Sequence, residues 1–136
     1  MQSSFTGPYK TNFRVRYADT DNMGVVYYGN YLTFLEVGRT ETMRELGLSY
    51  HEMEERGILM PAVEAHMVYK KPAKYDDLLT IVTVVERFPK AKIKFKSEIF
   101  NQNGEILADG YVELAFVNKN TGRPTRCPEY LLQLLQ

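Results

Sequence analysis

Hydrophobic and polar residues alternate in several segments of the chain, and this period of two predicts β-strands. The clearest segment is 92–100, where every second residue from Ile93 to Ile99 is apolar or small and the residues between them are charged. One face of this strand is expected to pack in the core and the other to meet water or phosphate. Further strands are predicted at 13–17, in a segment through Val68 and Tyr69 that ends at Pro72, and at 78–85 and 106–117.

A spacing of three and four residues after Asn30 predicts one long helix that ends at Gly47. Its apolar or small face carries Tyr31, Phe34, Leu35, Gly38, Thr42 and Leu46. At 1.5 Å per residue the helix is roughly 25 Å long, about the width of a small sheet. Ser49 and Glu52 form a capping box ahead of a short second helix, and a short C-terminal helix is expected from about Pro128.

These elements predict an α+β fold, in which one long central helix packs on a mostly antiparallel sheet of roughly five strands. No linker rich in Pro, Gly or Ser and no repeat divides the sequence, so residues 1–136 are expected to form a single domain. Because one helix leaves sheet edges and apolar area uncovered, we expect at least a homodimer.

The charge and cysteine content exclude several classes of partner. Lys plus Arg and Asp plus Glu each number 17 among 136 residues, so no overall field favours nucleic acid or an acidic membrane surface. Cys127 is the single cysteine, which excludes an internal disulfide and favours a reducing, cytoplasmic compartment. Residues 1–9 lack the apolar segment of a signal peptide, and no apolar run is long enough to span a bilayer. We therefore expect neither secretion nor membrane insertion.

Two carboxylates, Asp19 and Asp21, stand in the loop directly ahead of the long helix. The first N–H groups of a helix have no intrahelical acceptor and carry the positive end of the helix dipole, so they can bind a carbonyl oxygen as negative charge develops on it. A carboxylate beside them can attack the carbonyl carbon or activate a water molecule. This loop is the first candidate for a catalytic site.

Two other roles suit carboxylates in such a loop. Asp is a favoured turn residue, so both side chains can serve only to shape the turn. A calcium loop of the EF-hand type, counted from Asp19, requires a bidentate Glu at position twelve, but Asn30 stands there and Met23 occupies position five. The residues leave the turn role open and argue against a metal site.

The segment from Asp19 to Tyr31 reads D-T-D-x-x-G-x-V-Y-Y-x-N-Y and runs into F-L-E at 34–36 and R-T-E at 39–41. It resembles the signature of the 4-hydroxybenzoyl-CoA thioesterase family, in particular its branch of short acyl-CoA thioesterases associated with the Tol-Pal system. Residues 75–79 and 122–128 resemble the Y-D-D-x-L turn and the closing G-x-P-x-x-x-P segment of the same family. The resemblance implies a hotdog fold and a thioester hydrolase that uses no cofactor.

By its position in the resembled signature, Asp21 is the catalytic carboxylate and Asp19 is structural. The resemblance also implies that a backbone N–H in the Tyr28–Gly29 region, at the start of the central helix, binds the thioester carbonyl. Because the thiolate of coenzyme A is a good leaving group, one carboxylate and one oxyanion site can suffice for hydrolysis. Attack by Asp21 on the acyl carbon and activation of water by Asp21 both stay open.

Basic and apolar residues are candidates for contacts to the substrate. The densest basic cluster contains Arg87, Lys90 and Lys92 and continues through Lys94 and Lys96. Lys90 is preferred for the phosphates of coenzyme A, because the resembled family often places basic residues in that turn. Arg123 and Arg126, and then Lys70 and Lys71, rank lower for this role. The acyl pocket is expected between helix and sheet, across the dimer, with walls from Tyr28, Tyr31, Leu59 and Met60.

Four further residues have a weaker case for function. Glu36 is an alternative carboxylate, because some hotdog thioesterases use a Glu on the helix, but it lies off the packing face. His51 and His66 lack the spacing of metal ligands, and Cys127 has no evident base beside it. We expect these residues to be structural or to lie at the surface.

Together the signature and the architecture predict hydrolysis of acyl-CoA thioesters to the free acid and coenzyme A. One alternative is a non-catalytic hotdog module that binds acyl-CoA or a partner protein. A hydratase or dehydratase ranks third, since the loop offers no His base. The sequence leaves open the acyl group, the choice between coenzyme A and acyl carrier protein as its carrier, and the choice between homodimer and homotetramer.

Overall fold

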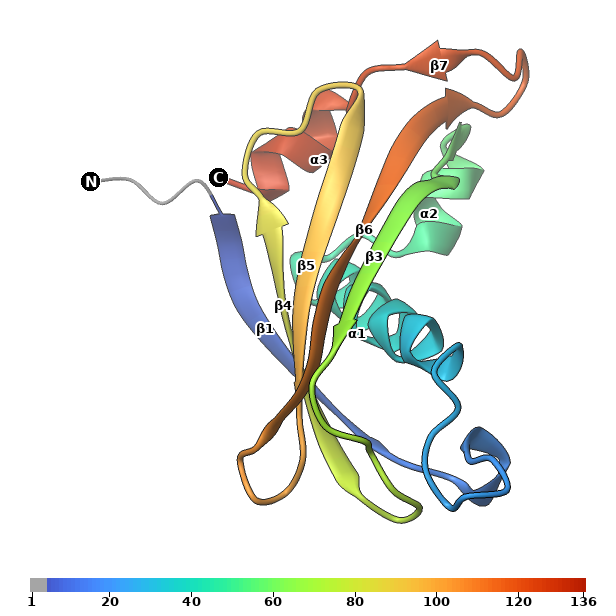
Figure 1. The fold of residues 1–136 in the computed structure, drawn as a ribbon. Helices are drawn as coiled ribbons and strands as arrows, with labels where there is room; N and C mark the ends of the chain where they lie inside the picture. The colour runs from blue at the N-terminus through green and yellow to red at the C-terminus, as the bar shows by residue number, and fades with distance from the viewer. Residues whose placement is uncertain (1–4) are drawn as a thin grey trace.

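The computed structural model describes residues 5–136 as a curved antiparallel sheet with a long helix packed against it (Figure 1). The helical elements are η1 (Tyr17–Asp19), α1 (Asn30–Leu46), α2 (Tyr50–Glu55) and α3 (Glu129–Leu134). The strands are β1 (Phe5–Arg14), β2 (Ile58–Leu59), β3 (Ala62–Tyr69), β4 (Leu78–Glu86), β5 (Lys92–Phe100), β6 (Ile106–Asn118) and β7 (Pro124–Thr125).

The strand order is β1-β4-β5-β6-β2, with β3 and β7 also paired to β6, and each of these pairs is antiparallel. The prediction of an α+β fold with an antiparallel sheet is confirmed. The sheet has seven strands instead of roughly five, because β2 and β7 add two residues each beside β6. Strands this short carry no readable alternation, so the sequence pattern could not reveal them.

The predicted first strand at 13–17 is wrong at both ends. β1 begins at Phe5 and its ladder with β4 ends where Arg14 pairs with Leu78. The chain then turns, so Tyr17 lies in η1 with 80% of its surface exposed. The early part of β1 was missed because a register shift between Thr6 and Tyr9 breaks the alternation there.

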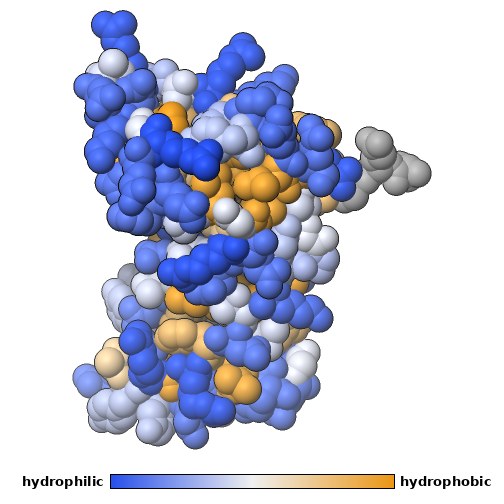
Figure 2. Space-filling view, turned by 180° about the vertical axis from the view of Figure 1, so that it is seen from behind, coloured by the Kyte–Doolittle hydropathy of each residue, from blue (hydrophilic) through white to orange (hydrophobic). Residues whose placement is uncertain are grey.

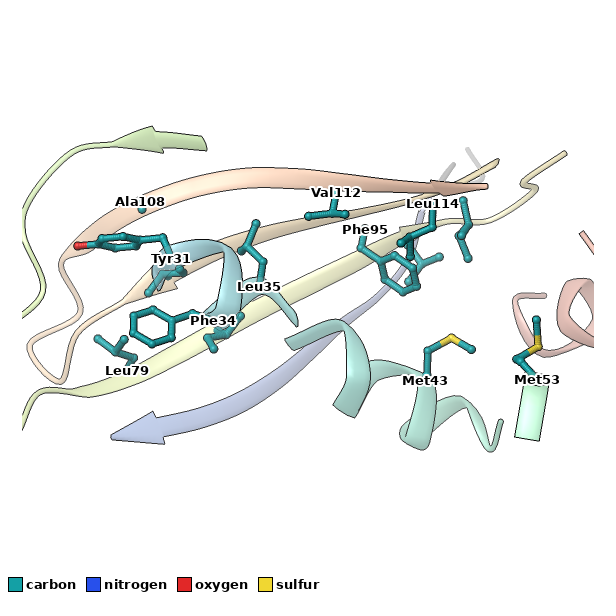
Figure 3. Packing of buried hydrophobic residues seen from close by; sticks show 14 of the residues in the cluster. Tyr31, Phe34, Leu35, Met43, Met53, Leu79, Phe95, Ala108, Val112 and Leu114 are labelled. Atoms are coloured by element: carbon teal, nitrogen blue, oxygen red, sulfur yellow. The ribbon is translucent and has the colours of Figure 1, made fainter. Parts of the chain in front are cut away.

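The core lies between α1 and the concave face of the sheet (Figure 3). Phe34, Leu35 and Met43 point from α1 toward side chains of β4, β5 and β6, and all three are at most 2% exposed. On β5 the alternation predicted from sequence is observed, since Ile93, Phe95, Ser97 and Ile99 are buried and charged residues lie between them. Burial of this apolar area is the main term that stabilises the fold.

Gly38 is the point of closest approach between α1 and β4. A Cβ atom at this position would lie 2.7 Å from Cγ2 of Ile81 and 2.7 Å from Oγ1 of Thr83. Thr83 itself is held by a buried hydrogen bond with Ser97, at 2.9 Å between the two hydroxyl oxygens. The helix can therefore lie at this depth only with glycine at position 38.

Strand β3 is one edge of the sheet and is exposed, and β1 forms the opposite edge. It pairs with β6 on one side, and no strand within residues 5–136 pairs with its other side. Seven of its eight residues are exposed, including Val63 and Val68.

Elsewhere, Figure 2 shows a face on which hydrophobic residues form separate patches in a mostly hydrophilic surface. None of the helices in residues 5–136 is both long and apolar enough to cross a bilayer.

The Gly38→Ala variant tests the contact between α1 and the sheet. In an exposed helix this change would stabilise by about 1 kcal/mol, because alanine has the higher helix propensity. Here the new methyl group meets the stiff, β-branched Ile81 and the tethered Thr83, so we expect the free energy of unfolding to fall by about 1–3 kcal/mol in urea titrations. Thr33→Ala, at an exposed position of α1, is the control, and a gain in stability for both variants would contradict this account of the contact.

Candidate active site

The loop between β1 and α1 is closed by backbone pairing into a compact hairpin. Thr20 forms an isolated bridge with Val26, and Val25 forms another with Lys74. Within the loop the N–H of Asp21 donates to the C=O of Val25 at 2.9 Å. These contacts hold Asp21 beside the segment that leads into α1.

Asp21 is half-buried, and only one of its carboxylate oxygens has a hydrogen-bond donor in residues 5–136. Its Oδ1 accepts the N–H of Met23 at 2.8 Å, a turn contact that orients the side chain. The other oxygen accepts no hydrogen bond, and no cation lies within ion-pair distance, in the same range of residues. This oxygen can act on a bound molecule.

The carboxylate of Asp19, in contrast, is hydrogen-bonded within the loop. Asp19 is 5% exposed, and its carboxylate accepts the N–H of Arg16 at 2.9 Å and two guanidinium hydrogen bonds at 3.0 and 3.2 Å. Burial raises the pKa of the Asp19 carboxyl, but the hydrogen bonds and charge of Arg16 outweigh burial and hold the pKa below its usual value. The C=O of Asp19 also accepts the N–H of Tyr27 and the side-chain amide of Asn30. Asp19 therefore joins the loop to the start of the helix.

The first turn of α1 presents free backbone donors. Gly29, the residue before the helix, has helical angles and provides no side-chain cap. The N–H groups of Asn30 and Tyr31 donate to the C=O groups of Tyr27 and Tyr28, whereas the N–H groups of Tyr28 and Gly29 have no acceptor within residues 5–136. Such amides at a positive helix end favour an oxygen that carries negative charge.

Gly29 leaves room for the ring of Tyr27. A Cβ atom at position 29 would lie 2.7 Å from Cε2 of Tyr27. The two rings of Tyr27 and Tyr28 are also in contact, with centroids 4.6 Å apart. The absence of a side chain at Gly29 thus lets an aromatic ring lie next to the free amides.

A cavity of about 290 Å³ lies beside these amides. Its lining residues are Val26, Tyr28, Tyr31, Tyr69, Lys70, Lys71 and Pro72. The Tyr69 hydroxyl donates to the C=O of Tyr28 at 3.2 Å, and the Tyr69 ring packs against Tyr31 with centroids 5.1 Å apart. Sequence reasoning selected Tyr28 and Tyr31 as pocket walls but missed Tyr69, because its placement depends on the pairing of β3 with β6.

The other predicted substrate contacts lie away from this cavity. Met60 lines a second cavity farther along α1. Leu59 lies in β2 and pairs with Val117 of β6. Arg87 and Lys90 lie in the turn between β4 and β5, at the end of the sheet opposite the Asp21 loop (Figure 1). Lys92 lies at the same end, 3.9 Å from the carboxylate of Glu113. One chain does not bring these basic residues to Asp21.

The remaining candidates occupy ordinary surroundings. His51 contacts Glu55 at 2.6 Å, and His66 stacks on Tyr111. Burial raises the pKa of the Cys127 thiol to about 12, so the thiol carries no appreciable thiolate at neutral pH. Within residues 5–136, no group of three His, Cys, Asp or Glu side chains is placed to hold a metal ion.

Comparison with known proteins identifies the family. Residues 15–135 match the model of the thioesterase-like superfamily. The chain belongs to this superfamily. This membership supports the predicted hotdog fold, and relatives named as acyl-CoA thioesterases confirm the prediction of a thioester hydrolase.

Two curated relatives and one solved structure are similar over most of the chain. YneP of Bacillus subtilis, named as a candidate acyl-CoA thioesterase, is 37% identical over 85% of this chain and 83% of its own length. The acyl-CoA thioesterase YbgC of Haemophilus influenzae is 35% identical over 85% of each chain. The crystal structure of DHNA-CoA thioesterase from Staphylococcus aureus is 38% identical, covers 90% of this chain and 80% of its own, and has a TM-score of 0.82.

The Asp19→Asn variant tests the structural role of the first carboxylate in this thioesterase loop. Because its pKa is lowered by folding, ionised Asp19 stabilises the fold above the unfolded-state pKa of about 3.9, and this stabilisation is lost as the pH falls through the lower folded-state pKa. We expect a loss of about 1–3 kcal/mol in the free energy of unfolding near pH 7, with the difference from wild type shrinking below about pH 4.

Asp76→Asn is the matched control for that measurement. Asp76 is exposed and its Oδ1 lies 3.7 Å from Arg14, so this variant should stay within about 0.5 kcal/mol of wild type. Equal losses in the two variants, or a loss at position 19 that does not depend on pH, would show that the contact with Arg16 is not the cause.

Proposed function

We propose that this protein hydrolyses acyl-coenzyme A thioesters to a free acid and coenzyme A at the loop that carries Asp21. The proposal rests on two kinds of group that have no hydrogen-bond partner within residues 5–136 and that lie in the loop leading into α1. One is the free carboxylate oxygen of Asp21, and the other is the pair of free N–H groups at Tyr28 and Gly29. Relatives named as acyl-CoA thioesterases support the choice of substrate class.

In this mechanism the N–H groups of Tyr28 and Gly29 bind the thioester oxygen as it gains negative charge. Asp21 either takes a proton from the attacking water or attacks the acyl carbon itself, and the carbon–sulfur bond then breaks to release the thiolate of coenzyme A. On the second route water hydrolyses the mixed anhydride. Both routes consume one water molecule and require the same free carboxylate oxygen.

The exposed edge of β3 supports a homodimer in which two copies pair antiparallel along this strand. An eight-residue edge with two exposed valines is a template for another strand. A two-fold axis beside β3 reverses the partner, so the sheet end that carries Arg87 and Lys90 of the partner subunit moves toward the Asp21 loop.

In the proposed dimer, the residues predicted to contact phosphate in one subunit can lie near the Asp21 loop of the other subunit. Within one chain they lie at the opposite end of the sheet. Lys70 and Lys71 line the nearer cavity, but they are paired with Asp109 and Glu105. Lys90 is exposed and forms no ion pair within residues 5–136, so it is available for a phosphate. We therefore assign the nucleotide end of coenzyme A first to Arg87 and Lys90 of the partner subunit. Lys92 lies at the same end but is 3.9 Å from Glu113, so it ranks after them. The likeness to the Tol-Pal-associated branch stays a prediction, and the acyl group and the choice between coenzyme A and acyl carrier protein stay open.

The Asp21→Asn variant tests the reaction directly. Release of free thiol from a panel of aliphatic and aromatic acyl-CoAs should show turnover by wild type and a fall in kcat/KM of about a thousandfold or more in the variant. Asp76→Asn, an exposed carboxylate outside the loop, should keep wild-type activity. Turnover that survives in Asp21→Asn but is lost in Glu36→Gln would move the catalytic role to the helix. Binding of acyl-CoA by wild type without any hydrolysis would favour a non-catalytic module.

A second experiment tests the dimer. Sedimentation analysis of the wild type should give a multiple of the 15.8 kDa chain mass. The double variant Val63→Asp, Val68→Asp should dissociate toward the monomer, because like charges would face each other along the paired edge. Leu134→Asp changes an exposed apolar residue on α3 and should leave the assembly intact. Dissociation in Leu134→Asp alone would place the interface elsewhere.

A further inference from the structure

The C=O group of Tyr28 and the N–H group of Gly29 belong to one peptide unit. This unit is planar and trans, so the two groups point in opposite directions. A contact that fixes the direction of the Tyr28 C=O therefore also fixes the direction of the Gly29 N–H, one of the two free amides at the start of α1. If the peptide turned over, a carbonyl oxygen would replace the N–H as the group offered to a bound oxygen.

Gly29 makes this peptide easy to turn. The residue has helical angles, with a φ of −64° and a ψ of −23°. Glycine has no Cβ atom, so it also reaches backbone angles that other residues avoid, and rotation of the peptide before it meets little resistance. The orientation of the Gly29 N–H therefore depends on the contacts of the Tyr28 C=O.

Two donors reach the Tyr28 C=O. The N–H of Tyr31 donates at 3.3 Å and is part of the same turn, whereas the Tyr69 hydroxyl donates at 3.2 Å and comes from β3. Both hydrogen bonds are long, so neither alone holds the peptide firmly. The bond from Tyr69 is the one that fixes the peptide relative to the sheet.

Tyr69 is itself held in place on two sides. Its backbone pairs with Ala108 of β6, and its ring packs edge-on against Tyr31 with centroids 5.1 Å apart. Tyr31 is 3% exposed, and its hydroxyl accepts the N–H of Ala73 at 3.0 Å. The donor to the Tyr28 C=O is thus positioned by packing before any substrate binds.

A hydrogen bond to the C=O also strengthens the N–H of the same peptide as a donor, because linked hydrogen bonds polarise one another. The Gly29 N–H then interacts more favourably with an oxygen that gains negative charge. Tyr69 can therefore act on the transition state without touching the substrate.

We propose that Tyr69 is a positioning residue for hydrolysis, whose hydroxyl holds the Tyr28–Gly29 peptide so that the Gly29 N–H faces the thioester oxygen. The inference rests on the proposed function. Since the oxygen carries negative charge mainly in the transition state, loss of the hydroxyl lowers kcat and leaves KM nearly unchanged. The ring of Tyr69 lines the cavity independently of its hydroxyl, so phenylalanine separates the two roles.

The Tyr69→Phe variant tests this role by kinetics. In thiol release from acyl-CoAs that wild type hydrolyses, we expect kcat to fall about tenfold and KM to stay within about twofold. Tyr111→Phe is the matched control, because it removes a hydroxyl of β6 that donates to Glu64 of β3, and it should keep both constants. An unchanged kcat in Tyr69→Phe, or a rise in KM alone, would overturn the positioning role.

A spectroscopic measurement tests the peptide itself. Tyr28–Gly29 is the one Tyr–Gly pair in the sequence, so labelling with carbonyl-¹³C tyrosine and ¹⁵N glycine gives a single correlated signal from this peptide. Without substrate, this signal should move in Tyr69→Phe and stay in Tyr111→Phe. A signal that stays in Tyr69→Phe would reject the inference whatever the activity. If wild type hydrolyses no thioester, the proposed function fails, and a moved signal leaves Tyr69 a structural contact only.

Discussion

The contact of Gly38 with β4 is the constraint on which the rest of the structure depends. It sets how deep α1 lies on the sheet, because any side chain at position 38 would meet Ile81 and Thr83. At that depth Phe34 and Leu35 fill the space above β4 to β6, and the beginning of α1 reaches the loop that carries Asp21. The buried hydrogen bond between Thr83 and Ser97 supports this contact from the sheet side.

Two aspartates only two residues apart have opposite surroundings in this loop. Asp19 is buried, accepts three hydrogen bonds from Arg16 and ties the loop to Asn30. Asp21 is half-buried and keeps one oxygen unused. The first carboxylate gives the loop its shape, and this rigid shape leaves the second free to act. The bridge between Val25 and Lys74 adds a backbone contact from outside the loop to these side-chain contacts.

Local patterns predicted α1 and β5 well because their periodicity is strong and their ends are marked. Gly47 has a φ of 91°, which ends α1 where the sequence places the end, and Ser49 forms the predicted capping box with Glu52. Edge strand β3 has seven exposed residues, so burial imposes no alternation on it and its limits could not be predicted.

The candidate site also contains residues that are close in sequence and residues that only the fold brings together. Asp21, Tyr28 and Gly29 are close in sequence, and a resemblance to a short signature was enough to group them. Tyr69 reaches the same place only through the ladder between β3 and β6. Contacts that require a second copy of the chain cannot be derived from one sequence by pattern alone.

The hydrogen bond from Tyr69 to the C=O of Tyr28 joins an outer strand to the turn that opens α1. If the proposed dimer forms along β3, this one hydroxyl would link its assembly to the amides of that turn. Dilution of the protein would then reduce the activity of each chain as well as the fraction of chains that are assembled.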